Sequence, residues 1–321
     1  MGAVVLAGAG CGTAAVCARA ESPYVELDAL RVGDIVHVPT GRAMTRGEAL
    51  DWLAAFRVVF VGETHDSPSD HAIERIVLEG LAARHGGRVA LGLEMLPQTD
   101  QPTLDAYLRG EVDDAAMQAL WERRWGPTWA QYRPLLALAR RLGIPVVALN
   151  CPRDVVQAVV AKGLDGLDPE TAARLPAMDR DDPWHRTLAR AVFEAHARGS
   201  GRFDRFEAVQ ALWDEAMADT AARFLRGPGR DRTLVVVAGA FHVRHGVGIP
   251  RRLFRRLPVP YATVVPIAVR VAPEREQALM ETAEVHVPLP VADLVWAVGY
   301  GDAPEIGAPE RPRATTPAAH R

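Results

Sequence analysis

Two apolar segments, far apart in the chain, each end in the pattern Gly-x-x-His. Residues 58–61 (VVFV) lead into GETH at 62–65, and residues 234–238 (LVVVA) lead into GAFH at 239–242. Unbroken apolar runs of this kind are typical of strands buried on both faces of a parallel sheet that helices cover. Polar residues just beyond the carboxyl end of such a strand lie where open α/β sheets bind ligands. The two copies therefore predict one site assembled from distant segments.

Four apolar runs with strand character, at 57–61, 88–93, 145–149 and 233–238, alternate with stretches of helical periodicity. This alternation predicts an α/β fold with a mostly parallel or mixed central sheet flanked by helices. The carboxyl ends of parallel strands lie at one edge of the sheet, so we expect the polar residues at those ends to converge. These residues are Glu63, His65, Glu94, Asn150 and His242, with His245 nearby.

The chain is expected to have three parts: a leader at 1–20, an α/β domain at 21–301 and a disordered tail at 302–321, which is rich in Pro, Ala and Arg. From about residue 167 to residue 225 the sequence contains no strand-like run and reads as several helices, so a helical insertion subdomain is predicted at about 165–228. Further strands are expected at 31–38 and 261–271, with edge strands at 285–287 and 294–298. Helices are expected at about 69–84, 101–109, 113–124, 129–142, 184–197 and 203–225, and Thr45 with Glu48 predicts a capping box for another that ends near Ala55.

The first 20 residues contain no acidic side chain, and Arg19 is their only charged one. The segment is too short to span a membrane and resembles the apolar part of a secretory signal. Residues 8–11 (GAGC) resemble a bacterial lipobox, in which a cysteine becomes lipidated, although Gly8 stands where Leu is usual. We expect an exported lipoprotein of the bacterial outer membrane or periplasm, anchored in the membrane through Cys11. The alternative is an apolar, poorly ordered N-terminus.

The overall composition is typical of a soluble globular protein. The 321 residues are 49% hydrophobic and 24% charged, and the formal net charge is -3. Nucleic-acid binding requires a concentrated basic surface, so this charge argues against a nucleic-acid partner. Cys151 is the only cysteine beyond the leader, which leaves no basis for a disulfide framework or a CxxC metal site.

Glutamate and histidine side chains at these strand ends could support two kinds of chemistry. Glu63 and His65 lie next to a flexible glycine, where they could bind a metal, polarise water or contact an anionic ligand. Glu94 ends an apolar strand, where a carboxylate must find a partner or shift its pKa. His242 and His245 would share one face if their segment were helical. The alternatives are solvated loop residues and a salt-bridged or helix-capping glutamate.

Three further residues could reach the same site. His71 is expected on the helix that follows the first Gly-x-x-His copy, facing either the site or the helix surface. Tyr132 lies close in sequence to Trp125 and Trp129, and tyrosinate is one kind of haem axial ligand, although such a cluster is more often core. Asp214 lies on an otherwise inward-facing helical stripe and could either reach the site or pair within the core.

Six short segments occur in an order that resembles a known family. They are FVGETHD at 60–66, GLEM at 92–95, YRP at 132–134, ALN at 148–150, QALWDEAMA at 210–218 and GAFH at 239–242. Together they resemble the ChaN-like haem-binding lipoproteins, within the wider superfamily that includes Tiki, TraB and erythromycin esterase proteins. The resemblance covers roughly residues 30–270 and implies an α/β fold with a helical subdomain, attachment to the outer membrane and a role in iron or haem uptake.

The resemblance implies two functions, and the residues of this chain are compatible with both. The first is haem binding by a membrane-anchored protein, with a homodimer left open, and its cofactor-binding candidates are His65, His71, Tyr132, Asp214, His242 and His245. The second is a hydrolase that uses a divalent metal ion or acid–base catalysis, and its candidates are Glu63, His65, Glu94 and His242. The residues that fix the pocket are thus shared by both branches of the superfamily.

Overall fold

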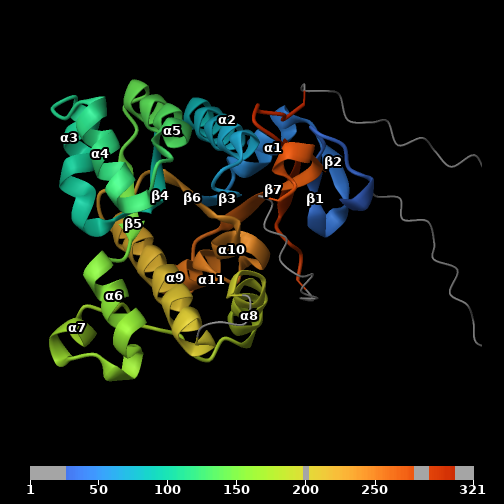
Figure 1. Cartoon of the computed structure of the whole chain (residues 1–321). Coiled ribbons are helices and arrows are strands. Elements are labelled where there is room, and N and C mark those ends of the chain that lie inside the picture. Colours follow the sequence, from blue (N-terminus) through green and yellow to red (C-terminus); the bar gives the residue numbers. More distant parts are fainter. Residues whose placement is uncertain (1–26, 198–201, 278–288, 308–321) are drawn as a thin grey trace, which may run out of the picture.

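The computed structural model describes residues 27–197, 202–277 and 289–307. Eight strands in these residues form one sheet in the order β2-β1-β8-β7-β3-β6-β4-β5 (Figure 1). The strands are β1 (Ile35–His37), β2 (Arg42–Met44), β3 (Val58–Glu63), β4 (Val89–Pro97), β5 (Val146–Asn150), β6 (Thr233–Gly239), β7 (Tyr261–Val271) and β8 (Leu294–Tyr300). The expected mixed α/β sheet is confirmed.

The six strands from β8 to β5 run parallel, whereas β1 pairs antiparallel with both β8 and β2. The prediction that 294–298 forms an edge strand is wrong, because β8 lies between β1 and β7. The edge on that side of the sheet is instead formed by β2, a strand of three residues that carries no apolar run of its own. The strand expected at 285–287 lies outside the described residues.

Helices cover both faces of the sheet (Figure 1). Helices α1 to α5 pack on one face, and α9 and α11 pack on the other. The helices are α1 (Arg46–Leu53), α2 (Pro68–Arg84), α3 (Gln101–Arg109), α4 (Asp114–Trp125), α5 (Trp129–Arg141), α6 (Arg153–Lys162), α7 (Pro169–Ala173), α8 (Pro183–Ala197), α9 (Phe203–Arg226), α10 (Ala240–Val243) and α11 (Ile249–Arg256). No helix among the described residues is long and apolar enough to cross a membrane.

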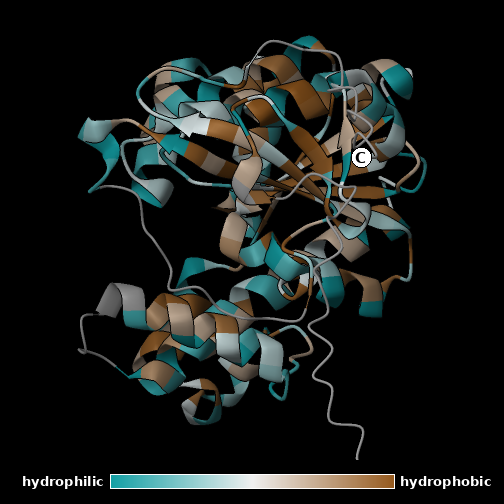
Figure 2. Ribbon diagram, turned by 90° about the vertical axis from the view of Figure 1, so that its right-hand side faces the viewer, coloured by the Kyte–Doolittle hydropathy of each residue, from teal (hydrophilic) through white to brown (hydrophobic). Residues whose placement is uncertain are grey.

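The alternation of side chains along β3 explains why its sequence is apolar without interruption. Val59 and Val61 pack under α1 and α2, whereas Val58 and Phe60 pack against α9 and α11 on the opposite face. Every residue of β3 and β6 is buried. Figure 2 shows the same arrangement as hydrophobic strands through the middle of the molecule, with hydrophilic residues on the outer sides of the helices.

Local sequence signals place the helices that carry the site. Thr45 and Glu48 form the expected capping box at the start of α1. The side chain of Ser67 accepts a hydrogen bond from the Asp70 amide and so caps α2, whose first residue is Pro68. Only the four residues 64–67 separate β3 from α2, which holds the first turn of α2 at the carboxyl edge of the sheet.

The segment in which a helical insertion was predicted, at about 165–228, contains helices α7 to α9 in its described residues and no strand. Helix α9 packs directly on the sheet, and its residues Met217, Ala218 and Ala221 join the core beneath β3, β4 and β6. Helix α6 packs against α9 to form a smaller apolar cluster. At the C-terminal end, Glu305 forms an isolated bridge with Gly299, so part of the segment from 302 to 307 lies against β8.

Candidate functional site

The carboxyl ends of three adjacent strands, β3, β6 and β4, bring the acidic residues of the site together. Glu63 is the last residue of β3 and lies opposite Gly239 of β6 in the strand register. Glu94 lies in β4, one residue beyond Leu93, which is paired with Val237 of β6. Strand β4 continues to Pro97, so Glu94 lies inside the strand and not just beyond it as predicted. Both carboxylates are buried.

Glu63 is the centre of the first network of side chains. Its Oε1 accepts hydrogen bonds from His65 Nδ1 at 2.8 Å and from the Tyr132 hydroxyl at 2.5 Å. Its Oε2 lies 3.2 Å from His71 Nδ1. Burial alone would raise the pKa of the Glu63 carboxyl, but its interactions with Glu74, His65 and His71 outweigh burial and hold that pKa well below the usual range. Glu63 is therefore a buried carboxylate anion.

His71 and Glu74, from the first turns of α2, complete this network. His71 Nδ1 lies 3.1 Å from Glu74 Oε1, and its Nε2 donates to the backbone carbonyl of His65 at 3.1 Å. Burial opposes the charge of the imidazole, but the negative field and the hydrogen bonds of Glu74 and Glu63 raise the pKa of His71 to about 11. Burial and the nearby Glu63 charge raise the pKa of Glu74 well above its usual range. The two carboxyl groups thus share one negative charge beside an imidazolium.

His242, on the short helix α10, is the centre of the second network. Its Nδ1 donates to Asp214 at 2.8 Å, and its Nε2 lies 3.3 Å from Glu94 Oε1. Asp214 also accepts a hydrogen bond from His185 Nε2 at 3.0 Å. The other oxygen of Glu94 accepts the Gly239 amide at 2.6 Å. All four side chains are buried.

The charges of this second network follow from its contacts. Burial would lower the pKa of His242, but the negative charges of Glu94 and Asp214 outweigh it and raise that pKa to about 10. Burial would raise the pKa values of both carboxyls, but the His242 charge and the hydrogen bonds from its neighbours hold them below the usual range. His242 is therefore an imidazolium between two carboxylates at neutral pH.

His65 lies between the two networks and is the accessible residue among them. Its side chain is 41% exposed, whereas that of Glu63 is fully buried. A β-carbon on Gly239 would lie 3.0 Å from His65 Nε2 and 3.6 Å from Glu94 Oε2, so only glycine leaves room for the ring there. The pKa of His65 is raised, because its hydrogen bond to Glu63 outweighs the effect of burial. The ring also meets Trp125 edge-on, with 5.1 Å between the ring centroids.

Two predicted cofactor ligands do not occupy the expected position. Tyr132 is 1% exposed and donates its hydroxyl to Glu63, and burial with the nearby Glu63 charge raises its pKa well above the usual range. A phenol that is held protonated in this way is a poor source of the tyrosinate that binds haem iron. His245 points elsewhere, because its Nδ1 lies 3.2 Å from the carbonyl oxygens of both Leu289 and Pro290.

The remaining predicted residues have supporting roles. Asn150 donates to the backbone carbonyl of Glu94 at 2.9 Å and so joins the ends of β4 and β5. Cys151 is buried, and burial raises the pKa of its thiol to about 12, which makes it unreactive. Cys11 lies outside the described residues.

Glu74 and His185 belong to the networks but were not predicted from the sequence. Glu74 follows His71 by three residues on a helix, a spacing that places two side chains on one face and could have indicated the pair. His185, on α8, contacts Asp214 although the two residues are 29 positions apart in sequence, and no local pattern indicates that contact.

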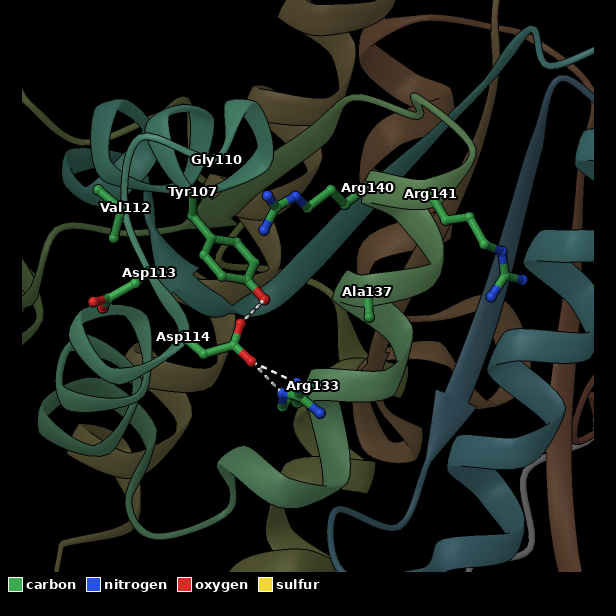
Figure 3. Close-up of a pocket in the computed structure, with 9 residues that line it drawn as sticks. All are labelled: Tyr107, Gly110, Val112, Asp113, Asp114, Arg133, Ala137, Arg140 and Arg141. Atoms are coloured by element: carbon green, nitrogen blue, oxygen red, sulfur yellow. Dashed lines mark hydrogen bonds and ion pairs between the residues drawn. The ribbon is translucent and has the colours of Figure 1, made fainter.

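Two cavities lie away from Glu63, His65, Glu94 and His242. One, of about 570 Å³, opens between α3, α4 and α5, where Asp114 accepts hydrogen bonds from Tyr107 and Arg133 (Figure 3). No residue of the two networks lines it. The other, of about 320 Å³, reaches the second network only through His185.

The charge of His242 predicts how the stability of the fold depends on pH. An unfolded histidine has a pKa of about 6.5, whereas burial opposed by the Glu94 and Asp214 charges leaves the folded pKa of His242 at about 10. The ion pairs of the His242 imidazolium therefore stabilise the fold fully when the pH is below the pKa that His242 has in the unfolded chain. This stabilisation is lost as the pH rises from there through the pKa that His242 has in the folded chain. We expect the free energy of unfolding to fall between pH 7 and pH 10, by up to about 1.4 kcal/mol per pH unit from His242. The fall should be measured as a lower urea midpoint at the higher pH.

Nuclear magnetic resonance of the imidazole nitrogens measures this charge directly. The His242 signals, identified by their loss in His242→Gln, should remain those of an imidazolium at pH 8. Titration of His242 at or below its unfolded pKa would contradict the ion-pair arrangement.

The chain matches the family described as haem-binding uptake, Tiki superfamily, ChaN over residues 49–253. Its structure is similar to one described as cofacial heme binding to ChaN of Campylobacter jejuni, with a TM-score of 0.62 and 15% identity over 82% of this chain and 95% of that chain. At this identity the likeness shows a shared fold. A mutant of the erythromycin esterase EreC in its open conformation aligns with a TM-score of 0.48 and 15% identity over 81% of this chain and 95% of that chain.

A curated relative, Protein RETICULATA-RELATED 5, chloroplastic, of Arabidopsis thaliana, is 27% identical over 258 residues. The aligned part is 75% of this chain but 34% of the relative, so the chain spans about a third of that protein's length. The family match covers well over half of the chain and includes every residue of the two networks. This chain therefore belongs to the ChaN family of haem-binding uptake proteins in the Tiki superfamily.

Proposed function

We propose that this protein binds haem at the carboxyl edge of its sheet, with His65 Nε2 on the iron. One observation carries the proposal: His65 is the accessible imidazole of the site, and a buried carboxylate fixes its ring from behind. Its Nε2 makes no hydrogen bond with any described residue. Membership of the ChaN family and the haem in the description of the Campylobacter structure support the choice of ligand.

The donor set around His65 fits haem iron. A histidine that binds a metal usually donates its second ring N–H to a carboxylate or carbonyl, which fixes its tautomer and raises its basicity. His65 Nδ1 makes this contact with Glu63 at 2.8 Å. Haem bound there would supply an iron with an open coordination position, and the chain would supply the ligand and its orientation.

Aromatic side chains beside the histidines supply apolar surface for a flat macrocycle. Trp125 contacts His65, and Phe241 and Trp213 contact His242 with ring centroids 5.2 and 6.2 Å apart. All three are half-buried, so each keeps accessible ring surface. Aromatic rings in such positions bury large areas on contact with a ligand.

Titration of the purified protein with hemin tests this function. We expect a saturable shift of the Soret absorbance, and light scattering of the complex would show whether one copy or a homodimer holds the haem. The absence of a Soret shift, together with a stoichiometric divalent metal in the purified protein, would reject haem binding.

We also propose that the protein is exported and anchored in the bacterial outer membrane through Cys11, where it takes part in iron or haem uptake. The lipobox-like GAGC at 8–11 and the uptake role in the family description support this location. The curated relative is named as a chloroplast protein.

Mass spectrometry of membrane fractions should find a chain that begins at a diacylated Cys11. Cys11→Ala should move the protein out of the membrane fraction, whereas Cys17→Ala, six residues further along, should not. An unmodified chain in the cytosol would refute both export and anchoring.

A second function, acid–base or metal-dependent hydrolysis, is favoured by one feature of the site. His242 Nε2 lies 3.3 Å from Glu94 Oε1, and His65 and Glu94 both lie next to Gly239, which carries no side chain. In that chemistry His65 would act as the base, and the His242 imidazolium would donate a proton or stabilise negative charge. Ester hydrolysis that is lost in both His65→Ala and His242→Gln would support a hydrolase.

A further inference from the structure

We infer that Glu63, His71 and Glu74 form a closed binding site for a divalent transition-metal ion, behind His65 and separate from the proposed haem position. One nitrogen and two carboxylate oxygens from these residues lie within 4.8 Å of one another, and all three side chains are buried. The set combines the end of β3 with the first turns of α2. It differs from the set of Glu63, His65, Glu94 and His242 that the sequence indicated.

The spacing of the three donor groups matches the coordination shell of a small ion. Zinc lies about 2.1 Å from imidazole nitrogen and carboxylate oxygen in a tetrahedral site, so two ligand atoms lie about 3.4 Å apart. His71 Nδ1 lies 3.2 Å from Glu63 Oε2 and 3.1 Å from Glu74 Oε1. The ligand atoms therefore need only small movements to surround an ion.

The orientation of His71 is that of a metal ligand. Its Nε2 donates to the carbonyl oxygen of His65, which directs Nδ1 toward the two carboxyl groups. A backbone carbonyl behind the ring is the usual outer contact of a histidine that binds metal.

One buried oxygen in the cluster, Oε2 of Glu63, lies 3.2 Å from His71 Nδ1 but makes no contact that has hydrogen-bond geometry. The Oε1 atom of Glu63 is occupied by the hydrogen bonds from Tyr132 and His65. The Oε2 atom is buried and has no hydrogen-bond partner among the described residues. Buried polar atoms are normally satisfied, and each exception needs an explanation. A cation between Glu63 Oε2, His71 Nδ1 and Glu74 supplies the missing partner.

The chemistry of the ligands indicates the class of ion. One imidazole with two carboxylates suits zinc, iron(II) or manganese better than calcium or magnesium, which prefer sites made of oxygen alone. The bound ion would stiffen the junction of β3 and α2 and hold Glu63, which in turn orients His65. The metal ion would thus help to fix the position of the exposed His65 side chain.

Cobalt(II) titration of the purified full chain, without haem, tests the site. We expect one equivalent to bind with a visible d–d absorption, and zinc to displace it. Glu74→Gln should weaken binding at least tenfold. Glu79→Gln, the same change on an exposed residue of α2, should bind as the wild type does. No cobalt binding by the wild type, or equal binding by Glu74→Gln, would overturn the proposal.

If Glu74→Gln fails to fold, X-ray absorption spectroscopy of the zinc-loaded wild type can test the site instead, because it identifies the ligands bound to the zinc ion. One imidazole with oxygen ligands supports the cluster of Glu63, His71 and Glu74. Two imidazoles would place the ion at His65 and His242 and overturn it. Because no haem is added, failure of this site leaves the haem proposal intact, and failure of the hemin titration leaves this one intact.

Discussion

Replacing His65 with alanine is expected to weaken hemin binding by about 100-fold or more while the protein stays folded. Loss of an outer contact of a metal ligand alone costs about 10- to 100-fold in affinity, and loss of the ligand itself costs at least as much. The side chain is 41% exposed, so its removal leaves little buried surface unfilled. Absorbance titration of both proteins with hemin measures the difference.

Two further variants separate the role of His65 from general effects. His37→Ala removes a half-buried histidine of β1 that bonds to Thr40, far from the site in the sheet order, and should bind hemin normally. Tyr132→Phe keeps the ring but removes the hydroxyl, and we expect an affinity within about tenfold of the wild type. If hemin still binds to His65→Ala but not to Tyr132→Phe, the iron ligand would be Tyr132 and not His65.

Asp214→Ala is expected to lower the free energy of unfolding by about 3–5 kcal/mol, the usual cost of removing one partner from a buried ion pair. Asp214 is fully buried and accepts hydrogen bonds from both His242 and His185. Its loss leaves the His242 imidazolium with Glu94 as the remaining partner. The loss should appear as a lower urea midpoint at neutral pH.

A matched control lies on the same helix. Asp219→Ala makes the same change at a partly exposed position, where the carboxylate pairs with Arg223, and should cost less than about 1 kcal/mol. Asp214→Asn keeps the shape but removes the charge, and its midpoint should lie between those of the wild type and Asp214→Ala. Equal midpoints for the two alanine variants would show that the second network does not stabilise the fold.

The parts of this structure that could be predicted from the sequence are those with a local cause. The run at 58–61 is apolar at every position because β3 is buried on both faces, and this pattern alone identified it as an inner strand. The capping box of Thr45 and Glu48 marked the start of α1. The parallel direction of β3, β6 and β4 then placed Glu63 and Glu94 at the same edge.

The parts that could not be predicted depend on contacts between distant segments. β8 looks like an edge strand in sequence, but pairing with β1 makes it internal. Tyr132 was a candidate haem ligand because tyrosinate can bind haem iron, yet its hydroxyl donates to Glu63, 69 residues away in sequence. Such a contact removes a residue from the accessible surface without leaving any local trace. The pairing of His185 with Asp214 escaped prediction for the same reason.

Both networks meet at His65. Glu63, held by Tyr132 and His71, fixes one ring nitrogen, and the absence of a side chain on Gly239 leaves space for the other. The buried carboxylates and imidazolium groups thus serve to place one exposed imidazole at a defined position on the sheet edge. That placement is the central feature of the site.

Resonance Raman spectroscopy of the ferric haem complex tests this feature most directly, since it identifies the atom bound to iron. We expect the signature of histidine nitrogen on iron, without phenolate vibrations, and loss of that signature in His65→Ala. Phenolate vibrations that persist in His65→Ala and disappear in Tyr132→Phe would contradict it.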